Sequence, residues 1–356
     1  MKHSELLLAA TTCIALTFAS CEKPKPQEEV SALPERGAIV LNEGGWGCNE
    51  AELSAIDYSD MTITNSVFSK LNGRGLGDVA QDVVVYGDKI YVAVWGSNTV
   101  EVLDRKTGKS TQIDMGNRGP RYIACDGGKV YVTCYTPESV VRIDTATLQL
   151  EATCRLSGMR PEGICALAGK LYVVNSWKPD EAGNAAYDST LSVVDIATFT
   201  ETSKIAIGLN PQKVKVVDNS HLAISYNGDY GTCPGGIAIV DAITLDVQKK
   251  AASVSNIESY GGKVYYYGNT IGQTWNGCIY VLNHASMESE SITLEGTDAF
   301  SATYYPYAIN INPNTGEIYM AGAQYGANGD IYCFTQMGRL KWKLEAGPLP
   351  SKIVQL

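Results

Sequence analysis

The sequence predicts an all-β fold, a seven-bladed β-propeller, and a repeated segment is the first reason. An apolar run ends in aspartate five times and in a degenerate residue twice, at Asp57, Asp104, Asp144, Asp195, Asp241, Asn283 and Thr335. Consecutive copies lie 40 to 52 residues apart. A period in the forties with strand-like units is typical of a propeller that has one four-stranded blade per repeat.

The order of strands within a repeat is the second reason. The clearest copy has apolar, β-branched runs at 122–125, 130–134, 140–144 and 150–156, and the hairpin turn Gly127-Gly128 separates the first two. A proline opens the innermost strand in most repeats, where no ladder hydrogen bond is lost. The predicted openings are Ala80, Pro120, Pro161, Pro211, Val254, Pro306 and Pro350.

The two ends of the chain are the third reason. Residues 350–356 supply a single strand, whereas the first repeat, from Ala38, lacks an inner strand. We expect the C-terminal strand to pair with the N-terminal blade, because this pairing closes the ring and covers both open sheet edges. Residues 38–356 are therefore predicted to form one propeller domain.

The N-terminal segment resembles a bacterial lipoprotein signal. Residues 1–20 contain a short apolar run that ends just before Cys21, and a proline-rich, charged stretch follows. We expect residues 1–20 to be a signal peptide, Cys21 to carry the lipid and residues 21–37 to form a flexible tether. An ordinary signal peptide that is cleaved near Ala19 is the alternative. The expected location is the outer membrane, with the protein lipid-anchored and facing the cell surface.

The net charge bears on the class of partner, and the positions of the cysteines bear on their roles in the fold. The net charge of −10 argues against a nucleic-acid partner. Six cysteines fall in predicted strands and are expected to be small apolar core residues, namely Cys125, Cys134, Cys154, Cys165, Cys278 and Cys333. Cys48 and Cys233 fall in loops on one predicted face, where both a disulfide and free thiols are possible.

Function is expected on one face of the ring. Strand directions alternate, so the connections between the second and third strands of each blade emerge on the same face as the connections between blades. We call this the loop face, and the opposite side, with its short stereotyped turns, the turn face. Predicted ligand-binding aromatic residues on the loop face are Trp46, Trp95, Tyr135, Trp177, Tyr187, Tyr226, Trp275 and Tyr325. Mutual capping of the blades is the structural alternative for these residues.

A second ring is expected around the mouth of the central channel. The residue that follows each inner-strand opening is polar, and the ligand-binding predictions at these positions are Gln81, Arg121, Glu162, Gln212 and Tyr307. Ser255 and Ser351 occupy the same position in the other two repeats. A polar ring inside an aromatic rim suits a bulky amphipathic ligand with amide or hydroxyl groups. Solvation of a water-filled channel is the alternative.

Catalytic and metal sites are not expected. The sequence has three histidines: His3 lies in the signal segment, and His221 and His284 are placed on the turn face. The loop face therefore lacks a histidine base, a Ser-His-Asp set and a histidine-rich metal cluster. We expect a non-enzymatic protein without a cofactor or a metal; a lyase or lactonase is a minor alternative.

Several segments resemble the YncE-like seven-bladed propeller lipoproteins of Bacteroidetes. The resemblance rests on Asn42-Glu43-Gly44, Leu53-Ser54 with Asp57, Phe68, Asn72-Gly73, the segment 76–81, Pro120-Arg121-Tyr122-Ile123 and the segment 312–317. It covers residues 38–356. The loop from Ser176 to Asp188, predicted to be unusually long, and Cys48 beside Trp46 are not features of this group.

The resemblance implies a function. The BtuG-type branch of this group captures vitamin B12 at the cell surface and passes it to a TonB-dependent outer-membrane transporter. We therefore expect a cobalamin-type corrinoid to be the transported ligand on the loop face and such a transporter to be the partner. The alternative is a scaffold at the cell envelope that binds a partner protein or a glycan.

Overall fold

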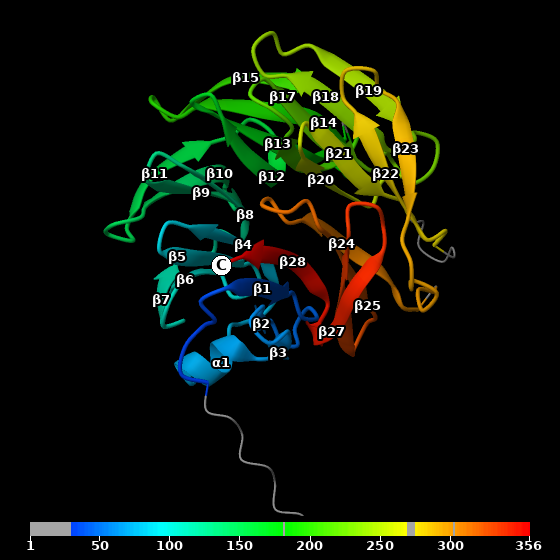
Figure 1. Cartoon of the computed structure of the whole chain (residues 1–356). Coiled ribbons are helices and arrows are strands. Elements are labelled where there is room, and N and C mark those ends of the chain that lie inside the picture. Colours follow the sequence, from blue (N-terminus) through cyan, green and yellow to red (C-terminus); the bar gives the residue numbers. More distant parts are fainter. Residues whose placement is uncertain (1–29, 181, 269–274, 302) are drawn as a thin grey trace, which may run out of the picture.

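The computed structural model describes residues 30–180, 182–268, 275–301 and 303–356. It contains seven four-stranded antiparallel sheets, and Figure 1 shows them arranged around a common centre. The predicted seven-bladed propeller is confirmed.

Blades 1 to 3 come first along the chain, and blade 1 also contains the C-terminal strand. Blade 1 comprises β28 (Pro350–Gln355), β1 (Gly37–Asn42), β2 (Glu52–Asp57) and β3 (Thr62–Thr64). Blade 2 comprises β4 (Ala80–Tyr86), β5 (Lys89–Val94), β6 (Thr99–Asp104) and β7 (Ser110–Asp114). Blade 3 comprises β8 (Pro120–Asp126), β9 (Lys129–Tyr135), β10 (Glu138–Asp144) and β11 (Leu150–Arg155).

Blades 4 to 7 follow in chain order. Blade 4 comprises β12 (Met159–Leu167), β13 (Lys170–Pro179), β14 (Ala185–Asp195) and β15 (Thr200–Ala206). Blade 5 comprises β16 (Pro211–Val216), β17 (His221–Tyr226), β18 (Gly236–Asp241) and β19 (Val247–Ala251). Blade 6 comprises β20 (Asn256–Tyr260), β21 (Lys263–Tyr267), β22 (Cys278–Asn283) and β23 (Ser289–Thr293). Blade 7 comprises β24 (Tyr305–Ile311), β25 (Ile318–Ala323), β26 (Asn328–Phe334) and β27 (Leu340–Pro348).

The ring closes as predicted. The C-terminal strand β28 pairs antiparallel with β1, with Val354 opposite Ile39 and Ile353 opposite Val40. Figure 1 shows β28, in red, beside β1, in blue. Blade 1 thus combines an inner strand from the C-terminus with three strands from the N-terminus.

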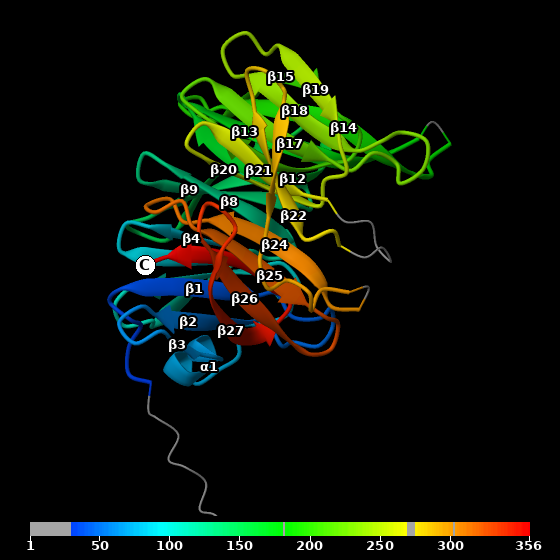
Figure 2. The ribbon, with the colours of Figure 1, turned by 45° about the vertical axis from the view of Figure 1, so that its right-hand side comes forward.

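The connection between blade 4 strands β13 and β14 differs from the prediction. Residues 176–188 were expected to form a long loop, but the ladder continues through most of them, with Trp177 opposite Tyr187 and Lys178 opposite Ala186. The β-branched and aromatic residues that flank this segment continue the strand pairing, so the expectation of a loop is wrong. Figure 2 shows the resulting hairpin projecting beyond the ring.

A short helix, α1 (Val67–Asn72), follows β3 and was not predicted. It buries Val67, Phe68 and Leu71, whose spacing places them on one side of the helix. Three inner strands also begin away from the predicted residue. Strands β12 and β24 begin earlier, at Met159 and Tyr305, because their ladders already start there, and β20 begins later, at Asn256.

The segment before β1 contacts the propeller on the turn face. Leu33 is buried, and its N–H donates to the Lys106 carbonyl at 3.2 Å. Part of the expected tether is therefore packed on the ring. The predicted signal peptide and Cys21 lie outside the described residues. No helix in the described part of the chain is long and apolar enough to cross a membrane.

The core lies between adjacent blades. Each second strand carries apolar residues on both faces, and a tyrosine recurs at the third position of β5, β9 and β13 as Tyr91, Tyr131 and Tyr172, all buried. Blade 5 departs from this pattern because Ala223 takes the corresponding place in β17. Burial of such large aromatic side chains stabilises the packing of neighbouring blades.

The described cysteines are free thiols. Of the six cysteines expected in the core, Cys134, Cys154 and Cys333 are buried, and burial raises the pKa of the Cys134 thiol to about 12. The other three, Cys125, Cys165 and Cys278, are only half-buried. Cys48 and Cys233 are exposed and unpaired.

The repeated aspartates close the turns between the third and fourth strands on the turn face. In blade 2, the Asp104 carboxylate accepts the N–H of Thr107 at 2.8 Å and its hydroxyl at 2.9 Å. In blade 4, Asp195 accepts the same two groups of Thr198 at 2.8 and 2.9 Å. The repeat in the sequence is therefore a turn motif, in which a side chain satisfies backbone groups that the ladder leaves free.

Candidate ligand-binding site on the loop face

A pocket of about 460 Å³ opens at the channel mouth on the loop face. Five of the seven positions in the predicted polar ring line it, namely Gln81, Arg121, Gln212, Tyr307 and Ser351. A second cavity of about 160 Å³ extends the pocket along the channel. The two share six lining residues, namely Asp82, Tyr122, Lys213, Asn256, Ser351 and Lys352. The inner strands place these side chains because each begins at the channel mouth.

Arg121 is the centre of the pocket wall. Its guanidinium donates to the Glu162 carboxylate from Nε at 3.1 Å and from Nη2 at 2.9 Å, and it also donates to the Gln81 side-chain oxygen. Burial of Arg121 works against its charge, but the Glu162 carboxylate together with Tyr122 and Tyr135 outweighs this effect, and the pKa of the guanidinium is raised. Arg121 therefore remains a cation with a fixed orientation.

Glu162 supports the pocket from behind. It is 5% exposed, and besides Arg121 it accepts a hydrogen bond from the Tyr135 hydroxyl. Burial first, and the Glu162 charge second, raise the pKa of Tyr135. Glu162, a predicted ligand contact, does not itself line the pocket. Its carboxylate positions two side chains that do, Arg121 and Tyr135.

Three further pairs complete the wall. The Tyr307 hydroxyl donates to Glu43 at 2.7 Å, and burial raises the pKa of that carboxyl although the hydrogen bond opposes the shift. Lys213 donates to the Tyr122 hydroxyl at 3.0 Å. Lys352 donates to Asp82 at 2.6 Å. The pocket thus presents ammonium, carboxylate, amide and phenol groups held by one another.

The loop-face aromatic residues form a continuous arc beside this pocket. Trp46 packs on Trp95 with ring centroids 4.6 Å apart, and Trp95 meets the edge of Tyr135 at 6.1 Å. Arg160 lies over both Tyr135 and Trp177, at 5.6 and 5.3 Å from their ring centroids. The arc therefore crosses blades 1 to 4 without a break.

The arc continues at both ends. Tyr187 lies opposite Trp177 in the β13–β14 ladder and meets Tyr230 of blade 5 edge-on, with ring centroids 6.0 Å apart. At the other end, the hydroxyl of Tyr325 lies 3.7 Å from the position that a Cβ would take on Gly45. Trp46, Tyr230 and Tyr325 are 63%, 73% and 75% exposed, so the rim offers apolar surface to the solvent.

The loop that carries Trp46 is held in shape by Asp78. The Asp78 carboxylate accepts the N–H groups of Gly47 at 3.0 Å and Asn49 at 3.3 Å. The Ser97 hydroxyl accepts the Asp78 N–H at 2.9 Å, which ties the loop to the Trp95 connection. Trp46 is therefore preorganised despite its exposure, which lowers the entropy cost of binding.

Two predicted rim residues belong to the core instead. Tyr226 is 7% exposed, and its ring fills the space that the hydrogen-only side chains of Gly208 and Gly236 leave open. Trp275 is 7% exposed and packs edge-on against Phe300, with centroids 5.0 Å apart. Their placement on the exposed rim was wrong. The glycines leave space inside the blade for the Tyr226 ring, and Phe300 offers a buried packing partner for Trp275.

Several pocket residues were not among the predicted ligand contacts. Arg160 precedes Pro161 at the start of blade 4 and reaches the rim with a left-handed backbone, φ 46°. Lys213 and Lys352 follow the polar-ring positions by one residue. A search of two successive residues at each inner-strand opening, instead of one, would have found both lysines.

Comparisons with known proteins show the fold. Residues 36–178 match the model of a family described as a domain of unknown function (DUF5074), which covers the chain from the start of the propeller into β13. No curated protein matches the sequence. Among solved structures, the chain is similar to hydrazine synthase of Kuenenia stuttgartiensis, with 16% identity, a TM-score of 0.58 and coverage of 76% of this chain and 92% of that chain.

Two further solved structures are similar at the level of the fold. U3-55K shares 10% identity over 75% of this chain and 81% of that chain, with a TM-score of 0.55. Dihydro-heme d1 dehydrogenase NirN in complex with DHE shares 11% identity over 89% of this chain and 74% of that chain, with a TM-score of 0.54. At these identities the likeness shows a propeller scaffold alone.

Proposed function

We propose that this protein is a non-enzymatic, lipid-anchored surface protein that captures a cobalamin-type corrinoid on its loop face. It then hands the ligand to a TonB-dependent outer-membrane transporter. The observation that carries the proposal is the continuous aromatic arc from Trp46 to Tyr230 beside a polar pocket of about 460 Å³. Concave sites that combine aromatic surface with a few fixed polar groups are suited to bulky small molecules.

The two parts of the site match the two parts of such a ligand. The ring faces of Trp46 and Trp95 suit the apolar surface of a corrin macrocycle, whereas Gln81, Gln212 and Tyr307 suit its peripheral amides. Arg160 and Lys213 add positive charge for the phosphodiester of the nucleotide loop. The resemblance to the BtuG-type branch supports the same ligand class.

The direction in which the chain enters the ring is compatible with surface capture. Residues 30–36 contact the turn face, where the Leu33 N–H meets the Lys106 carbonyl. The pocket opens on the opposite face. An anchor at Cys21 would therefore hold the protein by its turn face and leave the pocket open to the medium.

The test is a calorimetric titration of the protein with cyanocobalamin. We expect saturable one-to-one binding, and the double variant Trp95→Ala/Trp177→Ala should bind more than tenfold more weakly, because it removes the centre of the arc. Trp342→Ala is the matched control, since Trp342 lies on the outer strand β27 opposite Cys333 and should leave the affinity unchanged.

Two further titrants separate the alternatives. Cobinamide lacks the nucleotide loop, so weaker binding of cobinamide than of cyanocobalamin would locate that loop in the pocket. No heat with either corrinoid, together with binding of an oligosaccharide that the double variant loses, would replace the corrinoid by a glycan. If the wild-type protein co-purifies with the transporter but binds no corrinoid, the result would favour a protein scaffold.

A further inference from the structure

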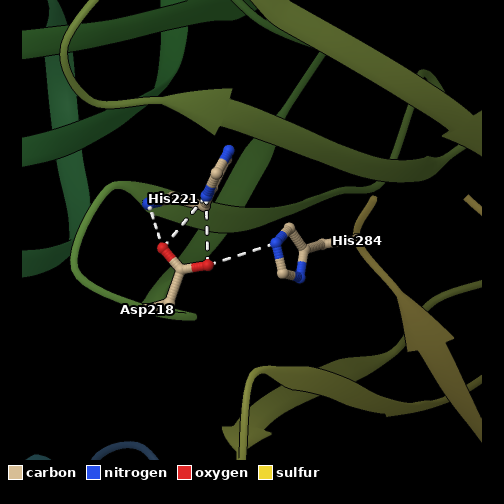
Figure 3. Close-up of side chains that lie close together, drawn as sticks. All are labelled: Asp218, His221 and His284. Carbon is tan, nitrogen blue, oxygen red and sulfur yellow. Dashed lines mark hydrogen bonds and ion pairs between the residues drawn. The ribbon is translucent and has the colours of Figure 1, made fainter. Parts of the chain in front are cut away.

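The two histidines of the described chain meet on the turn face, far from the ligand pocket. His221 opens β17 in blade 5, and His284 follows β22 in blade 6. Figure 3 shows the carboxylate of Asp218, which precedes β17, in contact with both imidazole rings. The ring centroids are 4.7 Å apart. The expectation of no metal site rested on the lack of histidines on the loop face and did not consider a site on the turn face.

Both histidines are departures from the blade repeat. The second strand opens with lysine in four blades, at Lys89, Lys129, Lys170 and Lys263, and with His221 in blade 5. At the position of His284, blade 3 has Thr145, whose hydroxyl donates to the Gly128 carbonyl at 2.8 Å. His284 Nδ1 makes the equivalent contact with the Gly262 carbonyl at 2.9 Å. Two substitutions of the repeat in adjacent blades thus converge on one carboxylate.

The hydrogen bonds of His284 leave two acceptor atoms facing each other, its own Nε2 and Oδ2 of Asp218. The Gly262 carbonyl can only accept, so Nδ1 of His284 carries a proton and donates it. In the neutral imidazole Nε2 then holds a lone pair, and it lies 3.1 Å from Oδ2 of Asp218, which is also an acceptor. A positive charge between these two atoms, a metal ion or a proton on Nε2, is needed to make the contact favourable.

We propose that Asp218, His221 and His284 form a binding site for a divalent transition-metal ion of the Zn²⁺ class. Their three ligand atoms lie within 4.8 Å of one another, with His221 Nδ1 3.0 Å from Oδ1 of Asp218. Two imidazoles and a carboxylate are preferred ligands of Zn²⁺. The carbonyl that holds Nδ1 of His284 is the outer contact that metal-binding histidines usually have.

The site is accessible and joins two blades. The side chains of Asp218, His221 and His284 are 35%, 31% and 18% exposed, so an ion can enter from the solvent. Asp241, opposite His221 in the ladder, adds negative charge nearby. Because blade 5 supplies two ligands and blade 6 the third, a bound ion would link the blades and leave a coordination position for water.

The test measures Zn²⁺ binding to the purified, tag-free protein. Binding is measured by calorimetry and by the shift of the thermal unfolding midpoint. We expect one ion per chain and a midpoint that rises with the Zn²⁺ concentration, because the ion binds the folded state. His221→Lys and His284→Thr restore the residues of other blades at these positions and should each weaken binding at least tenfold.

The control is Asp126→Asn, at the position in blade 3 that corresponds to Asp218, and it should leave Zn²⁺ binding unchanged. The His284→Thr variant keeps a donor for the Gly262 carbonyl, so both variants should fold. Absence of saturable binding up to about 1 mM Zn²⁺ would overturn the proposal and assign the positive charge to a proton on His284. Binding that both variants retain would also overturn it.

Discussion

The turn face and the loop face of the propeller are built from the same strands, but they differ in how closely the blades repeat one another. On the turn face, Asp104 and Asp195 close their turns with the same two hydrogen bonds to a threonine. On the loop face, each blade contributes a different side chain, from the exposed Trp46 to the buried Trp275.

This difference teaches where to look for function in a repeat protein. Positions that repeat serve a demand shared by all blades, which is to close a turn or to pack against a neighbour. Positions that depart from the repeat are free of that demand. The aromatic arc departs from it on the loop face, and His221 and His284 depart from it on the turn face.

The largest expected effect breaks the support of the loop-face pocket. Glu162→Gln removes the charge that pairs with Arg121, and their side chains are only 7% and 13% exposed. A buried cation without its partner is costly, so we expect the free energy of unfolding to fall by about 3 kcal/mol in urea denaturation.

The matched control lies near the turn face. Glu151→Gln also removes a charge that meets two cations, Lys129 at 2.6 Å and Arg142 at 3.1 Å, but Glu151 is 30% exposed. Exposed pairs contribute little, and we expect a loss below about 1 kcal/mol. Equal losses in the two variants would show that the loop-face pair is no more strongly coupled than a surface pair.

The second effect compares two glycines with left-handed backbones. In Gly119→Ala the new Cβ would lie 3.1 Å from Nε1 of Trp95, whereas the control Gly127→Ala on the turn face places its Cβ in open space. Their φ angles are 60° and 55°, so both variants should lose about 1 kcal/mol through backbone strain.

Only Gly119→Ala should also move the Trp95 ring. The measurement is the tryptophan emission spectrum together with the affinity for cyanocobalamin, and both should change in this variant alone. An unchanged spectrum in Gly119→Ala would show that the ring does not depend on the space that Gly119 leaves.

The same contrast explains what the sequence could predict. The turn motif and the apolar strands recur, so their period specified the blade number and the closure by β28. The polar ring occupies the same position in every repeat, and five of its seven predicted positions line the pocket. Tyr226 and Trp275 were misplaced, because burial of a loop-adjacent ring depends on Gly208, Gly236 and Phe300, which come together only in the fold.

The cluster on the turn face was missed for a related reason. His221 and His284 belong to different blades, and their meeting depends on how blades 5 and 6 pack. Alignment of the seven repeats with one another would have marked both residues as departures. It would not have shown that they share Asp218.

The third effect concerns pH at the loop face. Burial raises the pKa of Glu43 above the ordinary 4.5, and the Tyr307 hydroxyl only partly opposes this. A raised carboxyl pKa stabilises the fold fully below 4.5, and this contribution is lost as the pH rises through the folded-state value. In Glu43→Gln this decline is absent. The thermal unfolding midpoint of the variant minus that of the parent should therefore increase as the pH is raised beyond 4.5.

The smallest expected effect has the opposite sign and belongs to the turn face. The N–H and then the hydroxyl of Thr198 lower the pKa of Asp195 below the ordinary 3.8. A lowered carboxyl pKa stabilises the fold above 3.8, and this contribution is lost as the pH falls through the folded-state value. In Asp195→Asn the midpoint should therefore be lower than in the parent by a constant amount at neutral pH.

The difference in midpoint between the parent and Asp195→Asn should shrink below pH 3.8. Protonation of Asp195 in the parent then removes the stabilisation by the carboxylate charge, which the variant lacks at every pH. Thermal unfolding of parent and variant between pH 2 and 7 measures it. A difference that stays constant to pH 2 would mean that the turn is held by the backbone and not by the carboxylate charge. Opposite slopes for Glu43→Gln and Asp195→Asn would separate the two faces by their chemistry: one face buries a carboxyl in its pocket, and the other uses carboxylates to close turns.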